Sequence, residues 1–138
     1  MRRLLALLLL LTPACASCGE QPPALTLQAQ EGKFEGFLDE FVSLSDFLWT
    51  NLPLEVGLQV EVTLPSRGAW GDTGWNPDIQ RYIIRVHPAA CPTVAFWTLL
   101  HEYSHCLVWD VPCTGEHGPY WGVAYSQCWE VYEDWLAI

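Results

Sequence analysis

Residues 99–109 (LLHEYSHCLVW) contain two histidines four positions apart, with a glutamate directly after the first. In a helix, residues i and i+4 lie about 5–6 Å apart on one face, so His101 and His105 can bind one ion. Two imidazole ligands leave room on Zn²⁺ for a third ligand and a water. Glu102 would lie beside the ion and take a proton from that water. The motif indicates zinc-dependent hydrolysis; its structural alternative is two core histidines satisfied by hydrogen bonds.

A third ligand is expected just before the last predicted helix. His117 is followed by Gly118, which permits a close approach, and by Pro119, which suits the first position of a helix. A rival is Glu130, whose spacing from Asp134 is similar to the third-ligand helix of glutamate-type zincins. Acidic residues at i and i+4 are common on solvated helices, so we predict His117.

Other residues are candidates for supporting roles. Glu116 stands next to His117 and is a candidate to orient an imidazole. An anionic intermediate also needs a hydrogen-bond donor, and the spacing does not choose among Tyr82, Tyr120 and Tyr125.

These residues resemble the SprT-like zinc metallopeptidases, which combine His-Glu-x-x-His on one helix with a later His-Gly-Pro-x-Phe or His-Gly-x-x-Phe segment. The resemblance covers roughly residues 31–121 and implies a small zincin fold with three histidines on zinc. It also implies peptide-bond hydrolysis by a zinc-activated water, with Glu102 as general base. The matching residues are His101, Glu102, His105, His117, Gly118, Pro119 and Trp121, with tryptophan in place of phenylalanine.

The elements that must position these residues follow from periodicity. The helical segments are amphipathic, the strand segments alternate and are rich in valine or isoleucine, and the segment between the strands is rich in glycine and proline. We predict an α+β domain over residues 31–138 with a short antiparallel sheet. The elements are a helix from 31 to about 52, a strand over 54–64, a loop or wide hairpin over 65–77, a strand over 79–88, a helix from 94 to about 109 capped by Thr93, and a helix from 119 to the C-terminus.

The first residues indicate export. Two arginines, eight apolar residues and a small-residue cleavage pattern predict a signal peptide over 1–16, too short for the roughly 20 residues of a membrane span. Cys15 and Cys18 also resemble the acylated cysteine of bacterial lipoprotein signals. Residues 17–30 read as a tether. We expect a secreted, periplasmic or cell-envelope protein, outside the reducing cytosol.

Charge narrows the range of partners. Without residues 1–16 the chain keeps four basic residues against sixteen acidic ones, a net charge near −12. Nucleic acid is therefore excluded as a partner, since phosphate binding needs a basic surface. The DNA-linked biology of intracellular SprT-like proteases does not carry over. The expected partner is a peptide or protein substrate, and membrane contact is expected only through a lipid anchor at Cys15 or Cys18. Such acidity suits basic substrates, although solubility alone would explain it.

Four cysteines fall within the predicted domain, and export permits disulfides. Cys91 and Cys106 flank one helix and would lie about 22 Å apart, too far for a bond. If two antiparallel helices meet at the zinc, Cys91 comes level with Cys128, which leaves Cys106 to pair with Cys113. We therefore predict the pairs Cys91–Cys128 and Cys106–Cys113; four free thiols are the alternative.

Eight tryptophans are many for this length. Trp70 and Trp75 fall in the glycine-rich segment, where they either line a groove for an extended peptide or cap a small core. The sequence as a whole favours an exported zinc endopeptidase. The two alternatives are a non-catalytic zinc-binding envelope module and a metal-free structural lipoprotein.

Overall fold

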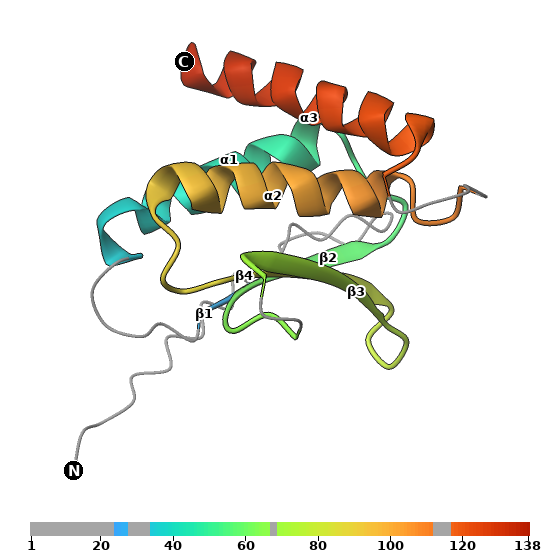
Figure 1. Ribbon diagram of the computed structural model, residues 1–138, viewed down its shortest axis with the longest axis horizontal. Coiled ribbons are helices and arrows are strands. Elements are labelled where there is room, and N and C mark those ends of the chain that lie inside the picture. Colours follow the sequence, from blue (N-terminus) through green and yellow to red (C-terminus); the bar gives the residue numbers. More distant parts are fainter. Residues whose placement is uncertain (1–23, 28–33, 67–68, 112–116) are drawn as a thin grey trace, which may run out of the picture.

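A computed structural model describes residues 24–27, 34–66, 69–111 and 117–138. The predicted signal peptide, Cys15 and Cys18 lie outside these residues. The α+β class is confirmed, and the three predicted helices are present (Figure 1). The elements are β1 (Ala24–Leu27), a 3-10 turn η1 (Glu35–Phe37), α1 (Leu38–Asn51), β2 (Gly57–Val62), β3 (Gly71–Asn76), β4 (Arg81–Val86), α2 (Pro92–Leu107) and α3 (Pro119–Leu136).

The sheet is mixed, so the prediction of an antiparallel sheet is wrong. Its order is β1-β2-β4-β3. β1 is parallel to β2 and β2 is parallel to β4, whereas β3 and β4 form an antiparallel pair. β4 has the most buried side chains and takes an inner position, while the glycine-containing β3 forms an edge. Because β3 lies on the far side of β4, the chain brings β2 and β4 together in parallel.

Two strands occupy segments that were not predicted as strands. β3 lies within 65–77, which was predicted as a loop or wide hairpin, and β1 lies within the predicted tether, 17–30. Gly71 and Gly74 are typical of loops and weaken the strand signal that Thr73, a β-branched residue, and Trp75, an aromatic one, provide in β3. One of the segments that pack on the predicted zinc helix is therefore a regular edge strand.

All three helices lie on one side of the sheet, and α2 packs directly on β3 and β4 (Figure 1). α3 covers α1 and α2. None of the described helices combines the length and apolar character needed to cross a membrane. The core forms between the sheet and the helices, and its fully buried members include Leu58, Val60, Val62, Ile84, Val86, Phe41, Leu44, Leu48, Leu99, Leu100 and Tyr103.

The predicted disulfides are wrong. Cys91, Cys106 and Cys128 are free thiols; Cys113, the predicted partner of Cys106, lies outside the described residues. Cys91 is exposed at the start of α2, whereas Cys128 is buried and accepts a hydrogen bond from the Ser104 hydroxyl at 3.4 Å. Ser104 lies thirteen residues after Cys91, about 20 Å along the helix. Cys91 and Cys128 are therefore too far apart to bond.

The reason is the register of α2 against α3. The two helices run antiparallel, as expected (Figure 1). However, His101 contacts Trp121 and Tyr125 within α3, with ring centroids 4.9 and 6.0 Å away. His117 precedes the helix and reaches His101 from its end. The prediction placed His117 level with His101 along the helix pair. It therefore placed Cys128 beside Cys91, whereas Cys128 lies beside Ser104.

Candidate metal centre

Helix α2 holds the first two histidines on a regular frame. Pro92 occupies its first turn, where a missing backbone N–H costs nothing, and the rest of the helix contains no glycine or proline. Leu99 and Cys106 are buried on the core side. His101 and His105, one turn apart, are half-buried and face outward.

Helix α3 positions the third histidine. Gly118, in extended conformation, precedes Pro119, which opens the helix. His117 therefore stands just outside the helix, exposed, with its side chain against α2. Its Nε2 lies 3.1 Å from Nε2 of His101, and Nε2 of His105 lies 3.3 Å from the same atom. The structure thus brings the three predicted histidines together, with one ligand atom of each within 4.8 Å of the others.

These three nitrogens fit a metal ion. Tetrahedral zinc with Zn–N distances of about 2.0–2.1 Å separates two ligand nitrogens by about 3.3 Å. The two Nε2 distances from His101, 3.1 and 3.3 Å, are close to that value. A neutral imidazole has one lone pair and one N–H, so three such nitrogens facing one point cannot all be satisfied by one another. A cation between them satisfies all three.

Trp121 holds the three rings together. Its ring centroid lies 4.9 Å from that of His101, 5.6 Å from His105 and 4.5 Å from His117. Tyr125 stacks on Trp121, with the ring centroids 4.7 Å apart. The indole thus restricts the orientation of every imidazole in the cluster.

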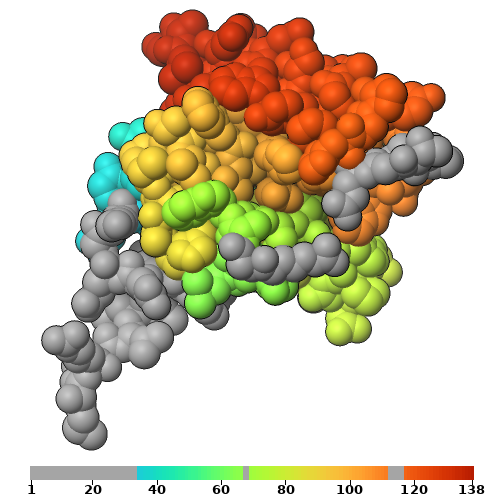
Figure 2. Space-filling model, viewed as in Figure 1, coloured from blue at the N-terminus to red at the C-terminus, as the bar shows by residue number. Residues whose placement is uncertain are grey.

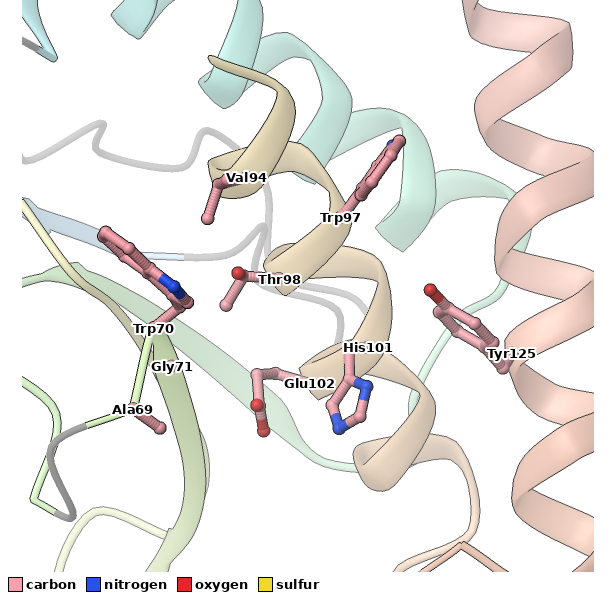
Figure 3. A pocket seen from close by; sticks show the side chains of 9 residues that line it. All are labelled: Ala69, Trp70, Gly71, Val94, Trp97, Thr98, His101, Glu102 and Tyr125. Carbon is pink, nitrogen blue, oxygen red and sulfur yellow. The ribbon is translucent and has the colours of Figure 1, made fainter. Parts of the chain in front are cut away.

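Glu102 is buried next to the cluster. Glu102 is only 8% exposed. The Thr73 hydroxyl donates a 2.6 Å hydrogen bond to Oε2 of Glu102. Burial raises the pKa of Glu102; the hydrogen bond from Thr73 opposes this, and the charge of Asp72 adds to it. Burial and the nearby His117 lower the pKa of His101, which favours the neutral form that binds metals. Figure 3 shows the Glu102 carboxyl and the His101 ring side by side in the cleft.

Gly71 allows β3 to approach α2 this closely. A Cβ at this position would overlap Thr98 Cγ2 and come within 2.9 Å of the Arg85 carbonyl oxygen. It would also lie 3.3 Å from Glu102 Cγ. A side chain here would push β3 from the helix and carry Thr73 away from Glu102.

A cleft of about 380 Å³ opens beside Glu102 and His101. It lies along α2, with the start of β3 on one side and α3 on the other (Figure 3). Figure 2 shows the surface of α2 exposed between those two elements on this face of the molecule. The remaining lining residues are mostly apolar: Ala69, Trp70, Gly71, Val94, Trp97, Thr98 and Tyr125.

The other candidates fall in different places. Glu130 and Asp134 are exposed on α3 and are not part of the histidine cluster. Tyr125 lines the cleft, whereas Tyr120 is exposed and Tyr82 is buried. Glu116 lies outside the described residues.

Sequence reasoning missed Thr73. Its role depends on β3 lying beside α2, which no local pattern reveals, although the threonine and tryptophan two places apart in Gly71–Asn76 are a weak strand signal.

No protein-family model, curated protein or solved structure matches this chain. The geometry of the site itself indicates its chemistry. That geometry offers three imidazole nitrogens that can hold a metal ion, a buried carboxylate beside them and an apolar cleft that leads to both.

Proposed function

We propose that the protein is a zinc-dependent endopeptidase of the SprT-like type. His101, His105 and His117 would hold the zinc, because an all-imidazole set suits this ion and leaves an open position. Bound zinc would supply a Lewis acid that activates water and polarises a peptide carbonyl. The resemblance of residues 101–121 to the SprT-like motifs supports the same conclusion.

The observation that carries the proposal is the position of Glu102. A buried carboxylate is costly unless it has a task, and the donor that Glu102 has among the described residues is one hydroxyl. This carboxylate lies directly beside the histidine cluster. Its raised pKa suits a group that accepts a proton from water and passes it to the leaving amine. Thr73 holds one carboxylate oxygen and leaves the other for this transfer.

The substrate would be an extended peptide. β3 is an edge of the sheet, so its outer backbone groups are able to pair with an added strand. The cleft reaches the start of this strand at Gly71 and extends to Glu102. Trp70 lines it, as expected for a tryptophan that contacts substrate.

Export remains part of the proposal. The signal-like residues 1–16 support it, with a lipid anchor at Cys15 or Cys18 as the only membrane contact. The acidic composition agrees with a protein or peptide substrate and no nucleic acid.

The test is cleavage of casein, an unfolded substrate, by the zinc-loaded protein and by Glu102→Gln. We expect the variant to keep its zinc and its melting temperature but to lose at least about 100-fold in kcat/KM. Glu130→Gln, an exposed carboxylate on α3, is the matched control and should cleave normally. Equal activity of Glu102→Gln and the wild type would contradict the proposed base. Zinc binding with no cleavage by either would favour a non-catalytic zinc-binding module.

A further inference from the structure

The far end of β3 carries a second group of aromatic side chains. The ring centroid of Tyr82 lies 5.3 Å from that of Trp75 and 5.3 Å from that of Trp109. Tyr82 is buried, whereas Trp75 is 39% exposed and Trp109 is 41% exposed. The buried Tyr82 ring thus contacts two partly exposed indoles. We call these three residues the aromatic notch.

Two carboxylates act on the phenol of the notch. Burial, and then the negative charges of Asp110, Cys106 and Glu55 in decreasing order, together raise the pKa of Tyr82 to about 12. Both carboxylates belong to exposed residues. The neighbouring cation, Arg81, packs against Gly57, and strand alternation directs it to the opposite face of the sheet from Tyr82. The notch therefore combines aromatic faces with net negative charge.

The notch and the cleft flank the metal centre from opposite ends. Trp75 lies two residues after Thr73 on the same face of β3, and Trp109 follows His105 by four residues. The cleft lies at the other end, beside Gly71 and Trp97. A peptide paired antiparallel to β3 would run from the notch toward the cleft. Its residue opposite Trp75 would come two positions before the one opposite Thr73, about 7 Å away.

We propose that the aromatic notch binds a lysine or arginine side chain of the peptide, two residues N-terminal to the residue that pairs with Thr73. A cation is attracted to the faces of tryptophan and tyrosine rings, and the carboxylates of Asp110 and Glu55 add to this attraction. The long aliphatic stem of either side chain would pack along the indoles. The position within a substrate rests on the proposed function, whereas cation binding by the notch does not.

The first experiment tests the notch without any peptide. The zinc-loaded protein is titrated with n-butylammonium and, separately, with 1-butanol, while the indole N–H signals are followed by NMR. Trp75→Phe and Trp109→Phe assign the two signals. We expect butylammonium to shift the Trp75 and Trp109 signals, butanol to leave them in place, and the Trp97 signal to stay unchanged with both. Equal shifts with both probes, or no shift with either, would overturn the proposal.

The second experiment tests the position in a substrate. Extended peptides that carry lysine, norleucine or phenylalanine at one position are bound to zinc-loaded Glu102→Gln, which should not cleave them. We expect lysine to bind about tenfold more tightly than norleucine at one position only, and Asp110→Asn to reduce this preference. Glu133→Gln, an exposed carboxylate near the end of α3, is the matched control for general charge attraction.

The outcomes separate the two proposals. Three results would contradict cation binding by the notch and leave the proposed peptidase function standing. They are peptide binding with no preference for lysine, a preference for phenylalanine, and a lysine preference that Glu133→Gln loses as much as Asp110→Asn does. No peptide binding, together with butylammonium shifts at Trp75 and Trp109, would contradict the proposed function and leave the cation site.

Discussion

The two faces of helix α2 differ in burial and in the kind of side chain they carry. On the core side, Ala95, Leu99 and Tyr103 are fully buried and pack against the sheet and α1. On the cleft side, His101 and His105 are half-buried and have aromatic neighbours. The core face is stabilised by the burial of apolar side chains, and a cavity there would be costly because protein interiors are closely packed. The cleft face presents ring nitrogens toward a shared point. The comparison teaches that the core face fixes where the helix lies and that the cleft face can then be specialised for chemistry.

The two faces meet at Glu102 and Tyr103. The Tyr103 hydroxyl donates a 2.8 Å hydrogen bond to the Leu52 carbonyl at the end of α1, which anchors the helix from behind. The Glu102 carboxylate receives its hydrogen bond from Thr73 on the sheet edge. Neighbouring residues thus connect α2 to two different elements. If this division is correct, changes on the two faces should affect different properties.

The largest effect is expected on the core face. Leu99→Ala removes a side chain that is 0% exposed and should lower the free energy of unfolding by about 3–5 kcal/mol. Chemical denaturation of the metal-free protein measures this. Thr93→Ala, at an exposed position in the first turn of α2, is the control and should change it by less than about 0.5 kcal/mol. A similar small loss for Leu99→Ala would show that this face is not tightly packed.

On the cleft face, His117→Ala should weaken zinc binding by more than about 100-fold, because it removes one of three ligands. The metal-free protein should keep its stability, since His117 is exposed. Competition with a chromogenic chelator measures the affinity. Glu130→Ala should bind zinc normally; if it alone loses zinc, the third ligand has been assigned to the wrong residue.

A smaller effect is expected at the contact between the cleft face and β3. Thr73→Val keeps the shape of the side chain but removes the hydroxyl that holds Glu102. Peptidase activity should fall about 10–100-fold at unchanged zinc content. Thr73→Ser restores the hydroxyl and should restore most of the activity. A valine variant with full activity would leave Thr73 without a part in positioning Glu102.

Reduction should have the smallest effect. Cys91, Cys106 and Cys128 are free thiols, so a reducing agent should leave the melting temperature of the purified domain unchanged. Thermal unfolding with and without dithiothreitol, in the presence of a chelator, checks this. A drop of several degrees would point to a disulfide that is absent from the described part of the chain.

What the sequence predicted well was local. The helical periodicity of 94–109 and the four-residue spacing of His101 and His105 depend on neighbouring residues only, and the glycine and proline after His117 define the start of α3. The three helices and the histidine cluster follow from these signals.

What the sequence did not predict depends on distant contacts. Strand order placed β3 beside α2 and made Thr73 a partner of Glu102. The disulfide prediction used helix rise alone, whereas His117 stands before its helix and shifts the register of the pair. Periodicity carries no information about either, because both are set by how whole elements pack.

X-ray absorption at the zinc edge of the purified, zinc-reconstituted domain tests the central claim most directly. Three histidine ligands predict one zinc per chain, with three imidazole nitrogens and one further light atom at about 2.0–2.1 Å. His117→Ala should lose one nitrogen from this shell or fail to retain the metal. A sulfur ligand at about 2.3 Å, or a protein that retains no zinc after dialysis, would contradict the assignment of this cluster as the metal centre.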